Sequence, residues 1–210
     1  LFNAIFTLFG PGDEVLIATP YWTSYPALVE LARATPVSAH GDATRDFRVT
    51  PEILEGLRTD ATRGLILNTP CNPTGTVYSM EELRELAEWA RDRGVWLICD
   101  EIYGNIYFDE DTEVAPGLLD LPRDSLGDHV LVDGASKSYA MTGWRIGFSV
   151  TSPELTRKFS ALQSQITSNA ATPSQMAALA AFGDTEAAGA SIRSMVSAFR
   201  RRRDLVTEGF

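Results

Sequence analysis

The chain has 210 residues, of which 44% are hydrophobic and 22% are charged, so a disordered or fibrous protein is excluded. With 28 acidic and 18 basic residues the net charge is −10, and we expect neither nucleic acid nor a membrane surface as a partner. The two cysteines, Cys71 and Cys99, lack metal-ligand spacing. They predict a reduced, cytoplasmic protein that has no bound metal and no disulfide framework.

The first residues have a short helical pattern. Apolar side chains recur at helical spacing over residues 1–9, and the sequence GPGD at 10–13 ends the run. No basic segment precedes the run and no cleavage site follows it, so a signal peptide is not expected. The pattern indicates instead the last part of a helix that begins upstream.

Apolar runs rich in Val, Ile and Leu then alternate with helical patterns. The expected helices cover residues 23–34, a short stretch after Thr50, residues 79–94 and most of the chain after Pro153. Ser79 and Glu82 form a capping box, and Gly94 ends that helix. The expected strands lie near residues 14–18, 36–40, 64–67, 95–99, 130–133 and 146–150. This alternation predicts an α/β fold in which a mostly parallel sheet is sandwiched by helices.

Chemically useful side chains follow several of these strands. Trp22 follows the first strand, Asn72 follows the third, Asp100 and Tyr103 follow the fourth, and Lys137 follows the fifth. In open sheets of this kind ligands bind at the carboxyl ends of the strands. The sequence therefore predicts one convergent polar site with an aromatic wall.

This set of residues suits pyridoxal 5′-phosphate, which needs an amine for its aldehyde and an acid beside its ring nitrogen. Lys137 and Asp100 are the candidates for these two roles. The cofactor also needs donors to its ring hydroxyl, a flat partner for its ring and a cation for its phosphate. The candidates, in that order, are Asn72 with Tyr103, Trp22 and Arg145.

Five motifs then occur in an order that can be recognised. They are PGDEV at 11–15, PYWTSYP at 20–26, NTPCNPTG at 68–75, DEIY at 100–103 and SKSYAMTGWRIG at 136–147. With these motifs the whole chain resembles the class I/II aminotransferases, pyridoxal-phosphate enzymes of the aspartate aminotransferase fold. The PYW and AMTGWR forms are most similar to the bacterial aspartate aminotransferase subgroup, which has prephenate-accepting members.

The resemblance implies a transaminase that moves an amino group between an amino acid, aspartate first, and a 2-oxo acid such as 2-oxoglutarate or a prephenate-like acid. It implies that Lys137 is the Schiff-base lysine and proton shuttle, and that Asp100 pairs with the ring nitrogen. Tyr103 and Asn72 would bind the ring hydroxyl. The remaining implied cofactor contacts are Trp22 on the ring, and Arg145 and Ser136 on the phosphate.

The resemblance also implies an assembly and a domain plan. The expected assembly is a homodimer, with Ser168 and Asn169 near the neighbouring subunit's site. Residues 1–210 would be the cofactor-binding large domain, cut at both ends, with the helix at about 184–210 leading toward a small domain. Three parts of the family's fold would lie outside the chain: its first strand, a phosphate loop and the substrate arginine. The first strand would pair beside residues 146–150. Gly134 departs from those family members that have a phosphate-binding serine at this position.

Other interpretations stay open at this point. Asp100 alone could cap a turn, Asn72-Pro73 is a common turn sequence, and Trp22 and Arg145 could serve packing or a surface ion pair. A lyase or synthase of the same fold would share the cofactor residues. An aminotransferase-like effector domain of a transcription regulator, or an inactive structural fragment, would share the fold.

Overall fold

A computed structural model describes residues 1–109 and 111–209. Its centre is a sheet with the strand order β2-β1-β3-β4-β5-β6. All the expected strands are confirmed: β1 (Glu14–Thr19), β2 (Thr35–His40), β3 (Thr62–Asn68), β4 (Trp96–Asp100), β5 (His129–Gly134) and β6 (Gly147–Val150). The strands from β1 to β5 pair in parallel, and β6 pairs antiparallel with β5. The mostly parallel α/β sandwich predicted from the sequence is therefore confirmed.

The helices also follow the sequence pattern, with small differences at their ends. They are α1 (Phe2–Leu8), α2 (Ser24–Leu31), α3 (Pro51–Leu57), α4 (Met80–Arg93), α5 (Pro153–Ile166), α6 (Thr172–Gly183) and α7 (Thr185–Glu208). The capping box of Ser79 and Glu82 is present, and Gly94 ends α4 with a φ of 63°. The second helix was expected to reach residue 34 but stops at Leu31. Arg33 adopts a φ of 65°, which a continuing helix does not allow.

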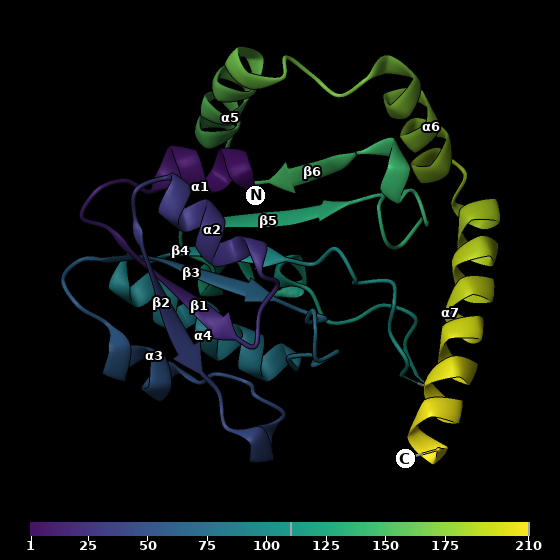
Figure 1. The fold of residues 1–210 in the computed structure, drawn as a ribbon, viewed down its shortest axis with the longest axis horizontal. Coiled ribbons are helices and arrows are strands. Elements are labelled where there is room, and N and C mark those ends of the chain that lie inside the picture. The colour runs from purple at the N-terminus through teal and green to yellow at the C-terminus, as the bar shows by residue number, and fades with distance from the viewer. Residues whose placement is uncertain (110, 210) are drawn as a thin grey trace.

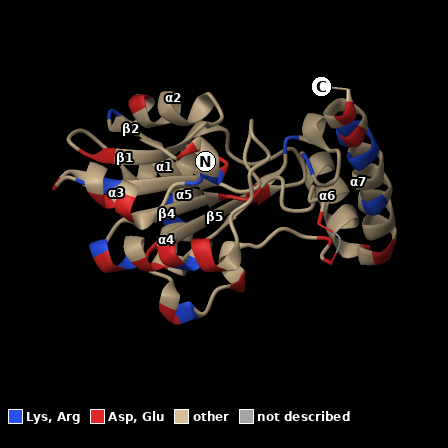
Figure 2. Ribbon diagram, turned by 90° about the horizontal axis from the view of Figure 1, so that it is seen from below, with Lys and Arg blue, Asp and Glu red and all other residues tan. Residues whose placement is uncertain are grey.

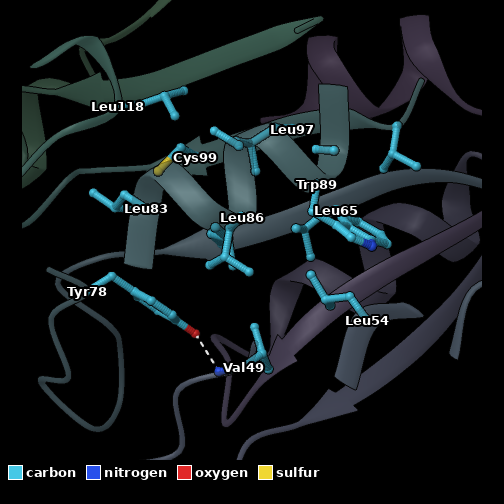
Figure 3. Close-up of a cluster of buried hydrophobic side chains, with 14 of the residues drawn as sticks. Val49, Leu54, Leu65, Tyr78, Leu83, Leu86, Trp89, Leu97, Cys99 and Leu118 are labelled. Carbon is cyan, nitrogen blue, oxygen red and sulfur yellow. Dashed lines mark hydrogen bonds between the residues drawn. The ribbon is translucent and has the colours of Figure 1, made fainter. Parts of the chain in front are cut away.

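The two faces of the sheet carry two separate hydrophobic clusters. Along β3, Leu65 and Leu67 point to the face covered by α3 and α4, whereas Ile66 points to the face covered by α1, α2 and α5. Figure 1 shows these layers, and Figure 3 shows the α4 side, where the Tyr78 hydroxyl accepts a hydrogen bond from the backbone N–H of Val49 at 3.0 Å. Alternation along each strand therefore serves both layers, as the apolar runs predict.

The helix α7 differs from the others because it has no buried side chain. In Figure 1 it stands to one side of the sheet, with α6, on the side toward which β1, β3 and β5 point. Figure 2 shows acidic and basic residues gathered along α7 and on the outer surface of α4. No helix in the described part of the chain is long and apolar enough to cross a membrane.

Candidate functional site

Asp100 is the last residue of β4, and its side chain is 4% exposed. Parallel pairing sets it between Asn68 of β3 and Val132 of β5. Its Oδ1 accepts the backbone N–H of Ile102 at 3.2 Å, and its Oδ2 accepts the hydroxyl of Tyr25 at 2.9 Å. Burial raises the pKa of Asp100, and these two hydrogen bonds act in the opposite direction. The result is a buried carboxyl group held in a fixed orientation.

Asn68 connects the end of β4 to the loop that follows β3 through two hydrogen bonds. Its Nδ2 donates to the backbone oxygen of Asp100 at 2.8 Å, and its Oδ1 accepts the backbone N–H of Asn72 at 2.7 Å. Asn72 in turn donates through Nδ2 to the hydroxyl of Tyr103, at a distance of 3.4 Å. Asn72 and Tyr103, predicted to share one ligand oxygen, therefore lie within reach of each other.

Lys137 lies in the loop that leaves β5. The loop returns onto itself through hydrogen bonds from Met141 N to the Ala135 oxygen at 3.2 Å and from Ala140 N to the Lys137 oxygen at 3.1 Å. The Nζ atom of Lys137 lies 5.5 Å from the centre of the Tyr103 ring. The amine is therefore placed at the same strand ends as Asp100 and beside an aromatic face.

Arg145 and Ser136 are brought together by Thr142. The Thr142 hydroxyl donates to the Ser136 backbone oxygen, and Arg145 Nη1 donates to the Thr142 backbone oxygen, each at 2.8 Å. Arg145 has a φ of 58°, in the left-handed region that non-glycine residues rarely adopt. In this conformation Arg145 ends the short helical turn over Thr142–Trp144 that precedes β6.

All the predicted site residues border one cavity of about 330 Å³. They are Trp22, Asn72, Asp100, Tyr103, Ser136, Lys137 and Arg145. Trp22, which is 40% exposed, forms part of the wall and meets the Tyr25 ring edge to face at 5.6 Å. The structure therefore brings these residues together, as expected from their places at strand ends.

The cavity is also bordered by residues that were not predicted as site residues, among them Tyr25, Asn68 and Asp133. Burial, together with the nearby charge of Asp100, raises the pKa of Asp133 to about 6. Asn68 lies within the motif NTPCNPTG, and Asp133 lies shortly before Lys137. Both could have been predicted as site residues from their places at the ends of strands. Tyr25 lies within the motif PYWTSYP, but its spacing on α2 is also typical of a packing residue.

Gly134 has a structural explanation. It pairs with Gly147 across β5 and β6. A Cβ atom at residue 134 would lie 2.6 Å from the Ile146 oxygen and 2.8 Å from the Gly147 Cα. A serine at Gly134 would therefore clash with the backbone beside it unless β6 moved, which explains why the residue without a side chain is found here.

Comparison with known proteins settles the family. The family model described as aminotransferase class I and II matches residues 1–210. The chain belongs to the class I and II aminotransferases. Among its relatives, the aspartate/prephenate aminotransferase of Cereibacter sphaeroides is 42% identical over 98% of this chain. An aspartate aminotransferase of Rhizobium meliloti is also 42% identical, over 100% of this chain.

Solved structures of this aminotransferase family have the same fold. A Thermus thermophilus aspartate aminotransferase variant superposes with a TM-score of 0.90 at 36% identity, covering 99% of this chain and 53% of its own. An aromatic aminotransferase from Pyrococcus horikoshii gives 0.91 at 32% identity, covering 99% of this chain and 54% of its own. The chain spans 50% of the length of both curated relatives named above.

Proposed function

We propose that this chain is the cofactor-binding large domain of a pyridoxal-phosphate-dependent aminotransferase. The observation that carries the proposal is the single cavity where Lys137 and Asp100 meet an aromatic wall, two ring-hydroxyl donors and an arginine. The family membership supports the same conclusion, because the named relatives are aminotransferases. A lyase or synthase of this fold would share the cofactor residues, and the names of these relatives favour the aminotransferase.

The residues present fit the cofactor. Pyridoxal phosphate supplies an aldehyde that bonds to amines and a ring that withdraws electrons when its nitrogen is protonated. A buried carboxylate is the partner that such a protonated ring requires, and Asp100 provides it at 4% exposure. Asn72 and Tyr103 offer neutral donors, and Arg145 offers a cation bordering the same cavity.

Each residue then has a defined task. Lys137 would hold the cofactor through Nζ, and its free amine would carry a proton to and from the substrate's α-carbon. Asp100 would keep the ring nitrogen protonated. Trp22 would contact the ring, and Arg145, with Ser136, would bind the phosphate. Tyr103 and Asn72 would orient the ring through its hydroxyl group.

The substrates and the assembly follow from the relatives. We propose aspartate as the amino donor and 2-oxoglutarate or a prephenate-like acid as the acceptor, since the relatives are named aspartate and aspartate/prephenate aminotransferases. The half-length match supports a longer enzyme, in which residues 184–210 lead toward a small domain that carries the substrate arginine. We propose a homodimer, with the exposed Ser168 and Asn169 near the subunit boundary.

Two free thiols support a cytoplasmic location for this enzyme. Cys99 is buried, Cys71 is half-buried, and both are free. Free thiols of this kind are typical of proteins kept in a reducing compartment.

The chain offers a sharp test, because Lys137 and Lys158 are its only lysines. The full-length enzyme is loaded with cofactor, reduced with borohydride and digested, and the modified peptide is identified by mass spectrometry. We expect the adduct on Lys137. Lys158 is the matched control, because it lies on α5 in an exposed ion pair with Glu154 at 3.0 Å.

Two variants complete this test. Lys137→Arg should abolish both the reduced adduct and the transamination of aspartate, whereas Lys158→Arg should change neither. An adduct found on Lys158 or on any other lysine of the full-length enzyme, or an active Lys137→Arg enzyme, would refute the assignment. A wild-type enzyme that binds cofactor but does not transaminate would refute the aminotransferase proposal itself.

A further inference from the structure

Tyr25 is a buried residue at the cavity to which the proposed function gives no role. It lies on α2, is 2% exposed, and belongs to the core cluster on that face of the sheet. Its hydroxyl nevertheless lies 2.9 Å from Asp100 Oδ2, and the residue borders the cavity. For packing alone a phenylalanine would fill the same space. The hydroxyl of Tyr25, and its contact with Asp100, therefore call for another explanation.

The proton in this contact belongs to Tyr25. Burial, together with the charge of Asp100, raises the Tyr25 pKa far above that of a free tyrosine. The hydroxyl therefore stays protonated and donates, and Asp100 accepts. A donated hydrogen bond stabilises the ionised carboxylate and opposes the effect of burial on the Asp100 pKa.

Tyr25 also contacts a second site residue. Its ring meets Trp22 edge to face at 5.6 Å with an interplanar angle of 87°, and its backbone N–H donates to the Trp22 oxygen at 3.0 Å. Edge-to-face pairs of this kind have a preferred geometry. One side chain therefore contacts both the carboxylate proposed for the ring nitrogen and the indole proposed for the ring face.

We propose that Tyr25 is a positioning residue that fixes Asp100 as an oriented, ionised partner for the cofactor's ring nitrogen. The inference rests on the proposed function, because it concerns the same cofactor. Its consequence is specific to one atom of the ligand. Removal of the hydroxyl should weaken the binding of a cofactor that carries a ring nitrogen, and should not affect an analogue that lacks it.

The experiment compares two ligands in three proteins. Dissociation constants of pyridoxal phosphate, and of the analogue in which carbon replaces the ring nitrogen, are measured for the full-length wild type, Tyr25→Phe and Tyr78→Phe. Tyr78→Phe is the matched control, because Tyr78 is also a buried tyrosine, 3% exposed, whose hydroxyl bonds Val49 away from the cavity. Circular dichroism and thermal melting establish that each variant is folded.

For Tyr25→Phe we expect about tenfold weaker binding of pyridoxal phosphate, as for the loss of a hydrogen bond to a charged group. Binding of the carbon analogue should be unchanged, and Tyr78→Phe should bind both ligands as the wild type does. In an Asp100→Asn background, Tyr25→Phe should have no further effect.

Equal weakening of both ligands by Tyr25→Phe would overturn the proposal, because it would show a purely structural role. No weakening of either ligand would overturn it as well. A wild type that binds no pyridoxal phosphate would refute the proposed function and this inference with it. A wild type that binds it, with either of the two results above, would refute the inference about Tyr25 alone.

Discussion

Asp133 gives the cavity a second carboxyl group, and its environment makes the protein sensitive to pH. Burial and the charge of Asp100 raise its pKa to about 6 in the folded chain. In the unfolded chain an aspartate titrates near 3.9. The unfolded state therefore loses its proton first as the pH rises, and stability falls between about pH 4 and pH 6.

The prediction concerns thermal stability without cofactor. The melting temperature of the wild type should rise as the pH is lowered from 7 to 5, and Asp133→Asn should show a smaller rise. Some rise should remain in the variant, because burial also raises the pKa of Asp100 and Glu101. Asp128→Asn, an exposed position just before β5, controls for the loss of one negative charge. Equal slopes for the wild type and Asp133→Asn would contradict the prediction.

At the scale of residues, the sequence located the cavity but not its internal hydrogen bonds. Lys137, Asp100 and Asn72 could be predicted because each lies at or soon after the end of a strand, and parallel strands end at one edge. Tyr25 could not, because its partner Asp100 is 75 positions away and only the packing of α2 on the sheet joins them. Hydrogen bonds of this kind depend on tertiary structure.

At the scale of elements, the pairing of β5 with β6 limits the size of the side chain at residue 134, just before the loop that carries Lys137. Gly134 faces Gly147, and an added Cβ would lie 2.6 Å from the Ile146 oxygen. Gly134→Ser should therefore destabilise the protein by about 1–3 kcal/mol, the usual cost of overpacking. It should also weaken cofactor binding, because the loop holding Lys137 begins there.

The control for this prediction is Gly143→Ser, since a Cβ at Gly143 meets nothing within 4 Å. Urea unfolding measures the stability of both variants, and cofactor titration measures their affinity. The opposite result, a Gly134→Ser variant as stable as Gly143→Ser, would mean that β6 can shift away at no cost.

Element ends and directions show where the sequence pattern stops being informative. The limits of α4 were predictable because a capping box and a glycine mark them chemically. The direction of β6 was not, because a strand of four residues has the same apolar pattern in either orientation. The α2 helix was expected to be longer because its apolar spacing continues past the point where the backbone turns.

For the molecule as a whole, the outer edge of the sheet at β6 is the feature most prone to association. All four residues of β6 are exposed, and Phe148, which is 43% exposed, lies 5.9 Å from Phe182 of α6. An exposed edge strand that carries apolar side chains favours pairing with another chain. This chain made alone is therefore expected to aggregate.

Phe148→Lys should lower that tendency, since a charge on an edge strand opposes edge-to-edge pairing. Light scattering and sedimentation at matched concentrations would measure it. Leu31→Lys is the control, because Leu31 is 63% exposed on α2 and introduces the same charge away from the edge. If both substitutions reduce aggregation equally, general charge rather than the β6 edge is responsible.

The helix α7 is long and weakly anchored, so a small rotation at one end would move its other end a long way. At 1.5 Å per residue its 24 residues extend about 36 Å, and a tilt of about 10° at Asp184 would displace the far end by about 6 Å. Such a tilt would leave the core intact, because α7 contributes no buried side chain. It would act on the loop that follows Tyr103, through Arg193 to Glu113 at 3.5 Å and Arg200 to the Asp109 oxygen at 2.8 Å. Whatever moves the far end of α7 therefore exerts a force on a segment that starts at the cavity wall.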